Sequence, residues 1–554
     1  MKKIALLFLV LFSQLIFSAT KITETEKLAA TCKVWGFLKY YHPKVASGEF
    51  NWDQQLLDVL PKIEKAQTKE EFSLILVNWI DALGEVPQIA PIAPQKDKEY
   101  FDKNFDLSWI NSNKLFSKNL SKKLKFIEEN RFQGEQFYIE GAEHVGNIHL
   151  KNESYKNPDF NDKNSKLRMI FMYWNLVEYF FPNKYLMDQK WDTTLEKAIP
   201  QVVNSKNEID FFSAMRKLVS KIDDSHTEFF LYNDPEEKGS RKFFPAECKI
   251  IDEKIVVTKI LADSLAQADG IKVGDQITKI DDKTIKQLIE EKRDLICASN
   301  EAKYLDKVIS EIMTGYADNH KVEFLKDGNS YTKTMTWYNY HDSHRNEFKK
   351  GAQKKREKYK LLENNIGYVD MGILKPRHIP DMIEMLKSTK ALILDMRNYP
   401  NGTFEGVGNF ISPNEKKFAI YTRPDLSYPG RFKWSEEGSS IGFENKDHYK
   451  GKVVVLLNEE SISQSEWTAM CFQTAGNTTI IGSQTAGADG NVCDFDFEGF
   501  HTLFSGIGVY YPDKTQTQRV GIVPDIEVKP TIKGIQEGKD EVLDRALVFI
   551  ESGK

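Results

Sequence analysis

Two segments in the N-terminal half of the chain repeat each other at one fixed spacing. WGFLKYYHP begins at Trp35, and WNLVEYFFP begins 139 positions later, at Trp174. Both copies carry apolar residues at helical spacing. An ungapped match over about forty residues predicts two related helical units, because self-similarity at a fixed offset is typical of duplicated structure. The same offset aligns Trp52 with Trp191, Pro61 with Pro200 and Phe72 with Phe211.

The two copies differ where they end. The first closes with WIDALGEVP and the second with LVSKIDDSHTEFF, so Ser225 and His226 stand where the first copy has Val86 and Pro87. Units that served only as scaffolding would not require a Ser-His pair in one copy. The alternative is an ordinary loop histidine that is solvated or hydrogen-bonded.

The length and charge of the chain limit its class. With 554 residues, 41% of them hydrophobic and 28% charged, the chain can bury several cores and divide into several domains. Its net charge of −5 comes from interspersed acidic and basic residues, without a basic block. This pattern argues against nucleic acid as a partner.

The N-terminus, MKKIALLFLVLFSQLIFSAT, combines two lysines, an apolar run and small residues at Ser18 and Ala19. We expect residues 1–19 to be a signal peptide that is cleaved on export, to the periplasm or the extracellular space. The run from Ile4 to Phe17 is short for a bilayer span, and no later segment reaches that length. We therefore expect no membrane span after cleavage.

Five cysteines are spread along the chain without CxxC spacing. They are expected to be buried small hydrophobic residues, with neither a disulfide framework nor a zinc site. Cys471 and Cys493 could pair in an oxidising compartment. No metal-ligand spacing and no phosphate-binding glycine loop is present, so we expect no cofactor and no metal.

The pattern changes to short strands between Phe243 and Tyr340. GIKVGDQITKID, which starts at Gly270, joins a glycine turn to an alternating, half-buried strand. This unit resembles a PDZ domain, which captures extended peptides by adding them as a strand. The carboxylate-binding glycine loop of such domains is not evident before Cys248.

From Asn365 onward, apolar strands alternate with amphipathic helices. NIGYVDM, ALILDMR, KVVVLLN and TTIIGS lack polar alternation, which predicts a mostly parallel sheet covered on both faces. Reactive loops in such sheets lie beyond the carboxyl ends of the strands. NYPNGT follows ALILDMR and EESISQSE follows KVVVLLN, so these two loops should meet at one edge.

The strand KVVVLLN leads into three serines and then a helix. Ser463 stands three residues before Glu466, which is the spacing of an ordinary capping box. It is also a position where the free N–H groups of a helix N-terminus can stabilise an anion, as hydrolases require near a nucleophile.

In order, these segments resemble peptidase family S41, which comprises the tail-specific or C-terminal processing serine peptidases and their tricorn relatives. The resemblance rests on the PDZ-like unit and on KALILDMRNYPNGT, SISQSEWTAM, IIGSQTAGADGNV and QTQRVGIVPDIEV. It implies a multidomain α+β chain with a ClpP/crotonase-like α/β catalytic core. The expected units are a signal peptide at 1–19, helical repeat units at 20–97 and 166–238, a linker or irregular subdomain at 98–165, a PDZ-like domain at 240–345, the catalytic core at 355–535 and a C-terminal helix at 536–554.

The resemblance implies Ser463 as the nucleophile. The processing peptidases take their base from a Lys in a TFGKG-type turn, but the turn TAGADG has Ala488 at that position, which excludes a Ser-Lys dyad. Tricorn-like members use the His of a Ser-His pair ahead of the PDZ-like unit. This implies His226 as general base, with Ser225 helping to orient its imidazole.

Two further parts of the site follow from the same resemblance. The fourth catalytic residue of the tricorn relatives is a Glu. This chain has Gln518 at the matching position, and its amide can hydrogen-bond Ser225 but brings no charge. Asp223 or Asp224 could supply that charge, although loop acids of this kind are usually solvated. The oxyanion donors would be the amides of Gly402 and Gln464; the other interpretation of Gly402 is a plain turn glycine.

The leading hypothesis is an exported serine endopeptidase that cleaves unfolded or flexible polypeptide through an acyl-enzyme. The alternative is a binding protein with the same fold and a dormant site, which captures a peptide or an apolar ligand. A small-substrate esterase or amidase is disfavoured because a PDZ-like unit serves extended chains. The tricorn relatives assemble, so a homo-oligomer is possible.

Overall fold

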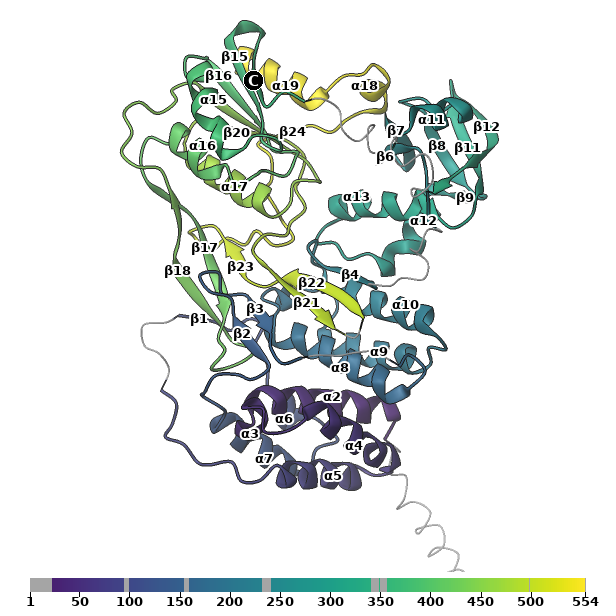
Figure 1. The fold of residues 1–554 in the computed structure, drawn as a ribbon, viewed down its shortest axis with the longest axis vertical. Coiled ribbons are helices and arrows are strands. Elements are labelled where there is room, and N and C mark those ends of the chain that lie inside the picture. The colour runs from purple at the N-terminus through teal and green to yellow at the C-terminus, as the bar shows by residue number, and fades with distance from the viewer. Residues whose placement is uncertain are drawn as a thin grey trace, which may run out of the picture.

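The computed structural model describes residues 22–93, 99–153, 159–231, 241–339, 348, 356–497 and 499–553 (Figure 1). The expected signal peptide lies outside these residues. The helical part lies at one end of the molecule, the α/β core lies at the other end, and the PDZ-like sheet lies beside the core (Figure 1). No helix in the described ranges has both the length and the apolar character needed to cross a bilayer.

The helical part is built from two sets of three helices that follow the sequence repeat. The first set is α2 (Glu24–Tyr41), α4 (Trp52–Lys65) and α5 (Lys69–Ala82), and the second is α8 (Lys163–Phe180), α9 (Trp191–Val203) and α10 (Glu208–Val219).

Equivalent tryptophans close each set by reciprocal hydrogen bonds. The Trp35 and Trp52 indole N–H groups each donate to the other's carbonyl oxygen, at 3.4 and 3.1 Å. Trp174 and Trp191 do the same at 3.0 Å each.

The segment expected as a linker or irregular subdomain contributes to the helical core. It forms α6 (Trp109–Ser112) and α7 (Lys118–Glu129), and Leu120, Leu124 and Ile127 pack into the same apolar cluster as the repeat helices. Their spacing along one helix face is the physical reason, because it gives a polar segment a buried stripe.

The PDZ-like sheet has five main strands in the order β12-β11-β8-β7-β6, all antiparallel. β6 (Ala246–Ile251) is an edge strand, and α13 (Glu301–Ile312) packs beside it. The other strands are β7 (Lys254–Ile260), β8 (Gln276–Ile280), β11 (Asn319–Lys326) and β12 (Asn329–Thr336).

The core sheet has the strand order β14-β15-β16-β19-β20-β24, with only the β14–β15 pair antiparallel. The strands are apolar throughout because helices cover both faces of the sheet. Leu392 and Leu394 pack in a cluster with helices α15 to α17, whereas Ala391 and Ile393 pack on the opposite face with α19. The strands are β14 (Tyr359–Leu362), β15 (Ile366–Asp370), β16 (Ala391–Asp395), β19 (Lys452–Leu457), β20 (Thr478–Gly482) and β24 (Ile526–Glu527), and the helices are α15 (Ile379–Leu386), α16 (Phe404–Ile411), α17 (Gln464–Gln473) and α19 (Glu541–Ser552).

Two hairpins connect the core to the helical part. The strands β17 (Lys416–Pro424) and β18 (Phe432–Ile441) extend from the core toward the helical part (Figure 1). At their turn, the Tyr41 hydroxyl of α2 donates a hydrogen bond to the Pro429 carbonyl (2.5 Å). β21 (Val492–Phe497) and β22 (Phe500–Ser505) form the second hairpin, and β22 pairs antiparallel with β4 (Glu228–Leu231). This pairing fixes the chain just after His226 to the core.

The remaining elements are short and surround these units. They are α3 (Pro43–Ala46), β1 (Tyr100–Phe101), β2 (Ile139–Gly141), β3 (Ile148–Leu150), β5 (Lys242–Phe243), α11 (Asp263–Asp269), β9 (Lys283–Thr284), α12 (Ile285–Lys292), β10 (Thr314–Gly315), β13 (Tyr338–Asn339), β23 (Gly508–Tyr510) and α18 (Ile532–Gln536).

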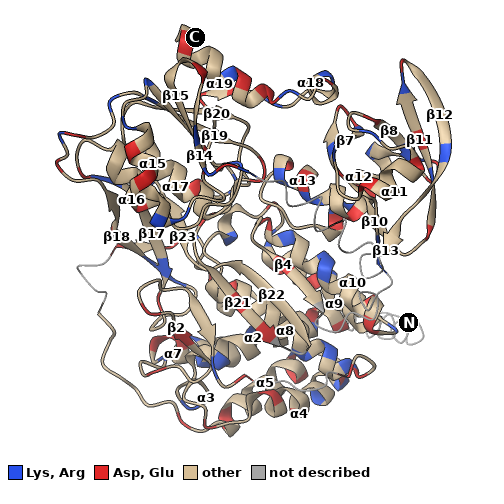
Figure 2. Cartoon of the chain, turned by 45° about the horizontal axis from the view of Figure 1, so that its top comes forward, with Lys and Arg blue, Asp and Glu red and all other residues tan. Residues whose placement is uncertain are grey.

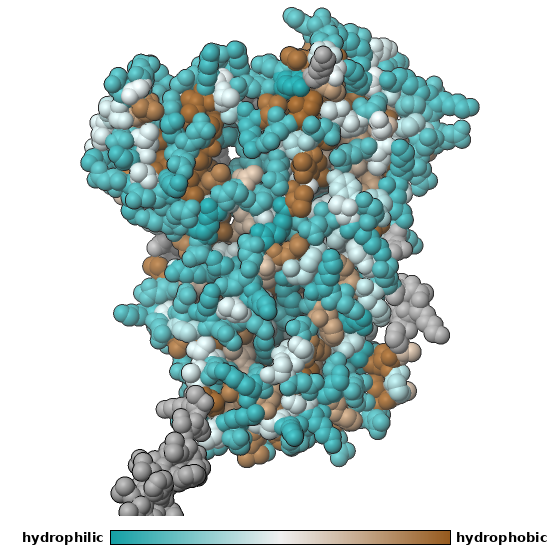
Figure 3. Space-filling view, turned by 180° about the vertical axis from the view of Figure 1, so that it is seen from behind, coloured by the Kyte–Doolittle hydropathy of each residue, from teal (hydrophilic) through white to brown (hydrophobic). Residues whose placement is uncertain are grey.

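Acidic and basic residues are interspersed along the ribbon in all parts of the molecule (Figure 2). The face opposite to that of Figure 1 is mostly hydrophilic, with separate apolar patches (Figure 3).

Candidate active site

Ser463 lies between β19 and α17, beyond the carboxyl ends of the parallel strands of the core sheet. Its backbone has φ 56° and ψ −120°, a left-handed conformation that costs a non-glycine residue about 1–3 kcal/mol. The loop before it is held to the neighbouring strand by the Ser461 hydroxyl, which donates to the Met396 carbonyl at 3.0 Å. The surrounding structure thus holds one strained serine at a helix N-terminus.

Glu466 ties this serine to a second segment, the turn formed by residues 485–488. Its buried carboxylate accepts the N–H groups of Ser463 (3.3 Å), Gly487 (2.9 Å) and Ala488 (3.0 Å), and the Thr485 hydroxyl. Burial raises the pKa of Glu466 to about 7, although these hydrogen bonds oppose the shift. The reach from Glu466 back to Ser463 N–H is the one expected in a capping box.

The 485–488 turn also contacts the loop that carries His226. Ser463 N–H donates to the Ala488 carbonyl at 2.9 Å, and the Ser225 hydroxyl donates to the Ala486 carbonyl at 2.7 Å. Ser463 and the Ser225–His226 pair are therefore held against one four-residue turn, although they lie more than two hundred positions apart in sequence.

The His226 imidazole is oriented by Ser505 at the end of β22. Nδ1 lies 2.9 Å from the Ser505 hydroxyl, which donates its single proton to Asp224 Oδ1 at 3.0 Å. The Ser505 oxygen must then accept from Nδ1–H, which leaves the lone pair of the neutral ring on Nε2. Burial lowers the pKa of His226, and the Asp224 charge opposes that shift.

The structure corrects three details expected from the sequence. Ser225 does not orient the imidazole, because its hydroxyl is engaged by the Ala486 carbonyl and accepts the Ser299 N–H at 2.8 Å. Asp224 is not a solvated loop acid but is fully buried, and its carboxylate accepts hydrogen bonds from Ser505 at the end of β22. Gln518 hydrogen-bonds Asp224 at 3.0 Å rather than Ser225.

His226 and Ser463 are not hydrogen-bonded to each other in the part of the chain that the structure describes. The proposed oxyanion donors flank the serine: Gln464 is the first residue of α17, and Gly402, at φ 65°, lies two positions before α16. The two helices approach each other at these ends, where Phe404 packs edge-on against Trp467 with ring centroids 4.4 Å apart.

Two basic residues that the sequence did not point to hold this region together. Lys307 of α13 donates to the backbone carbonyls of Ser225 (2.7 Å) and Cys297 (2.9 Å), and burial lowers its pKa. Arg519 donates to Asp188 and to the Ser299 carbonyl. Neither has a sequence signal, because each contacts groups that only the fold brings together.

A large cavity lies between the PDZ-like unit and the core. It has a volume of about 1350 Å³ and is lined by β6, α13 and the loop before Ser463, including Glu459 and Glu460. Lys249 of β6 forms ion pairs with both glutamates, at 2.6 and 3.0 Å. The edge strand of the PDZ-like sheet is thereby connected to the loop that leads to Ser463.

The five cysteines are free, so the pairing of Cys471 with Cys493 is not formed. Cys471 packs in the core-sheet cluster and Cys493 in the cluster of the helical part, and this separation is the reason.

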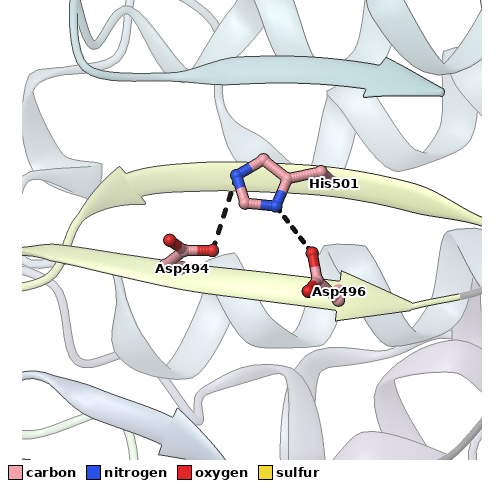
Figure 4. Close-up of side chains that lie close together, drawn as sticks. All are labelled: Asp494, Asp496 and His501. Atoms are coloured by element: carbon pink, nitrogen blue, oxygen red, sulfur yellow. Dashed lines mark hydrogen bonds and ion pairs between the residues drawn. The ribbon is translucent and has the colours of Figure 1, made fainter. Parts of the chain in front are cut away.

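One group of side chains on the β21–β22 hairpin has metal-ligating atoms close together. Asp494, Asp496 and His501 place these atoms within 4.8 Å of one another (Figure 4). The His501 ring lies 2.6 Å from Asp496 and 3.5 Å from Asp494, and both carboxylates are exposed. These contacts are an ordinary surface His–carboxylate arrangement, and the group lies outside the site around Ser463.

Two parts of the chain match the models of known protein families. The family model of peptidase family S41 matches residues 365–528, and that of the PDZ domain matches residues 235–300. No curated protein sequence matches the chain.

Solved structures resemble the chain at low identity. Mature CPAF has a TM-score of 0.55 at 12% identity, over 70% of this chain and 98% of its own, and CPAF complexed with lactacystin has 0.54 at 12%, over 70% and 99%. The photosystem II D1 C-terminal processing protease aligns over 68% of this chain and 98% of its own, at 16% identity with a TM-score of 0.38. The likeness to CPAF is one of fold.

The two domain matches fall on the units that carry the described geometry. The S41 match spans β15 to β24 and includes Ser463. The PDZ match includes β6 to β8. The chain is a serine-type peptidase that combines a peptidase family S41 domain at residues 365–528 with a PDZ domain at residues 235–300.

Proposed function

We propose that the chain is an exported endopeptidase that hydrolyses unfolded or flexible polypeptides through an acyl-enzyme on Ser463. The observation that carries this proposal is the hydrogen bonding of His226. Its Nδ1 faces Ser505, whose proton is committed to buried Asp224, so Nε2 holds the free lone pair of a base. The lowered pKa keeps this base neutral at pH 7.

The reaction follows from these positions. His226 Nε2 removes the proton of Ser463 Oγ as the oxygen attacks the substrate carbonyl carbon, and the N–H groups of Gly402 and Gln464 receive the resulting oxyanion. The imidazolium then donates that proton to the leaving amine, and the peptide C–N bond breaks. Water activated by the same nitrogen releases the acyl group. Substrate binding must close the gap between Ser463 and His226, as catalytic hydrogen bonds often tighten only in the complex.

The choice of polypeptide as substrate is supported by the cavity between the two domains. An extended chain can pair with the free edge of β6, and Glu459 and Glu460 connect this edge with the nucleophile loop. The N-terminal segment supports export, because it has the charged, apolar and small-residue parts of a signal peptide. Periplasmic or extracellular localisation is part of the same proposal.

The test is hydrolysis of a fluorophore-quenched, unfolded polypeptide by the mature chain and by Ser463→Ala and His226→Ala. Each variant should lose at least about a thousandfold in kcat, because nucleophile and base act as one unit. Ser465→Ala is the matched control: its buried hydroxyl has no partner among the described residues, so its removal should leave kcat unchanged.

Labelling with a fluorophosphonate reports on the nucleophile independently of substrate choice. The wild-type chain should be labelled and Ser463→Ala should not. Equal hydrolysis by all the variants would refute the assignment of these residues. A wild-type chain that neither cleaves nor becomes labelled would favour the dormant, peptide-binding alternative.

A further inference from the structure

Asp224 is a buried carboxylate whose two oxygens accept five hydrogen bonds. Its oxygens accept the N–H and hydroxyl of Ser505 (2.7 and 3.0 Å), the Gln518 amide (3.0 Å), the His226 N–H (3.2 Å) and the Thr227 hydroxyl (3.3 Å). The structure gives it no ion pair among the described residues. Three of these partners are N–H groups, which can only donate, so both oxygens act as acceptors.

Gln518 faces this carboxylate with its amide nitrogen. Nε2 lies 3.0 Å from Asp224 Oδ1 and 3.5 Å from the Ser299 hydroxyl, and the side chain is 4% exposed. A glutamate at this position would bring a second carboxylate to a site that already holds one. Two carboxylates at such a distance cannot both ionise without cost, so they share a proton.

We propose that Asp224, acting through Ser505, is the carboxylate that orients and stabilises His226, and that Gln518 is the amide donor that holds Asp224 in that role. The glutamine is then a functional part of the relay rather than a missing charge. All three are positioning residues, since none of them contacts the reacting atoms. The inference rests on the proposed role of His226 as base.

The relay makes a pH-dependent prediction for Gln518→Glu. At pH 6.5 the shared proton lets the introduced carboxyl group donate to Asp224 in place of the amide, so the relay survives. As the pH rises, that proton is lost and two negative charges face each other. The kcat of the variant relative to wild type should therefore fall by about tenfold or more between pH 6.5 and 9.

Gln518→Met provides the matched comparison, because methionine has a similar volume but neither donor nor charge. Its kcat relative to wild type should be lowered by a constant factor at every pH. The two variants should exchange order: Gln518→Glu is the more active at pH 6.5 and the less active at pH 9. A merely structural role for Gln518 gives no such crossing.

The experiment measures kcat and KM on the quenched polypeptide from pH 6 to 9 for wild type, both Gln518 variants and Ser463→Ala, with folding checked by circular dichroism. A crossing, with KM little changed, supports the relay. If the ratio of the two variants does not depend on pH, or if Gln518→Glu matches wild type at pH 9, the relay is wrong. If wild type is no faster than Ser463→Ala, the proposed function fails first and the relay fails with it.

Asp224→Asn keeps the test decisive if Gln518→Glu does not fold. Asparagine has the size of aspartate but only one acceptor oxygen. It can therefore accept from the N–H or from the hydroxyl of Ser505, but not from both as the two oxygens of Asp224 do. The kcat should fall about a hundredfold or more while KM changes little. Unchanged kcat in a folded Asp224→Asn variant overturns the proposal.

Discussion

At the scale of single residues, His42 is placed where its protonation must destabilise the fold. It is fully buried, and both ring nitrogens lack a hydrogen-bond partner within the described chain. Burial lowers its pKa to about 4, from an ordinary value near 6.5. Because the unfolded chain binds a proton at higher pH than the folded chain, stability is constant above about pH 6.5 and falls as the pH drops toward 4.

The sequence repeat supplies the substitution that tests this effect. Phe181 occupies the position equivalent to His42 in the second unit and is buried as well. Between pH 7.5 and 5, wild type should lose about 2 kcal/mol of unfolding free energy from this residue, and His42→Phe should lose none of it. Urea unfolding followed by tryptophan fluorescence measures the difference. A control variant at exposed His149, His149→Phe, should keep the acid sensitivity; equal sensitivity in His42→Phe would contradict the assignment.

At the scale of helices and strands, the two helical units meet about an approximate two-fold axis. α2 packs on α9 while α8 packs on α4. Each contact has an ion pair from a basic residue of the first helix to the equivalent aspartate of the other unit, Lys33–Asp192 and Arg168–Asp53. Residues near such an axis face their own equivalents. Gly36 and Asn175 are such a pair, and a Cβ at Gly36 would overlap the Asn175 carboxamide.

This contact predicts that glycine and asparagine can exchange places between positions 36 and 175, but that asparagine cannot occupy both positions. The Asn175 amide donates to the carbonyls of Phe171 (2.8 Å) and Cys32 (3.1 Å), which are themselves equivalent positions. Gly36→Asn alone should cost about 1–3 kcal/mol through overpacking. Adding Asn175→Gly should restore most of that loss, because the new amide meets the same two carbonyls in exchanged order. Urea midpoints measure both variants, and a double variant no more stable than the single one would exclude the two-fold arrangement.

The sequence predicts elements far better than it predicts their contacts. The apolar runs at 391–395 and 452–457 predict core strands, and Ser463, three residues before Glu466, predicts a helix start, because these patterns are local. The surroundings of Asp224 are not local, since Ser505, which contacts its carboxylate, lies 281 positions away. Ser505 carries no signal for the same reason. The candidate nucleophile and base could be named from the sequence, but the group that orients the base could not.

At the scale of the whole molecule, the candidate site lies where the helical part, the PDZ-like unit and the core meet, and Arg519 joins all three. Its guanidinium donates to Asp188 in the second helical unit (2.7 and 3.1 Å) and to the Ser299 carbonyl (3.0 Å), while its N–H donates to Gly487 in the 485–488 turn (2.8 Å). It follows Gln518 directly in the chain. Arg519 is therefore one of the residues that hold the His226 loop in place relative to Ser463.

Arg519→Ala should lower kcat by about tenfold to a hundredfold, since small displacements of catalytic groups are costly, while KM changes less. Arg431 is the matched control, because it also binds a carboxylate with two hydrogen bonds, to Asp102 at 2.9 and 2.7 Å, but at the turn of the β17–β18 hairpin. Arg431→Ala should reduce thermal stability without changing kcat. An equal fall in kcat in both variants would mean that general loosening of the molecule limits the reaction. A normal kcat in Arg519→Ala would mean that the turn and the His226 loop hold their geometry without it.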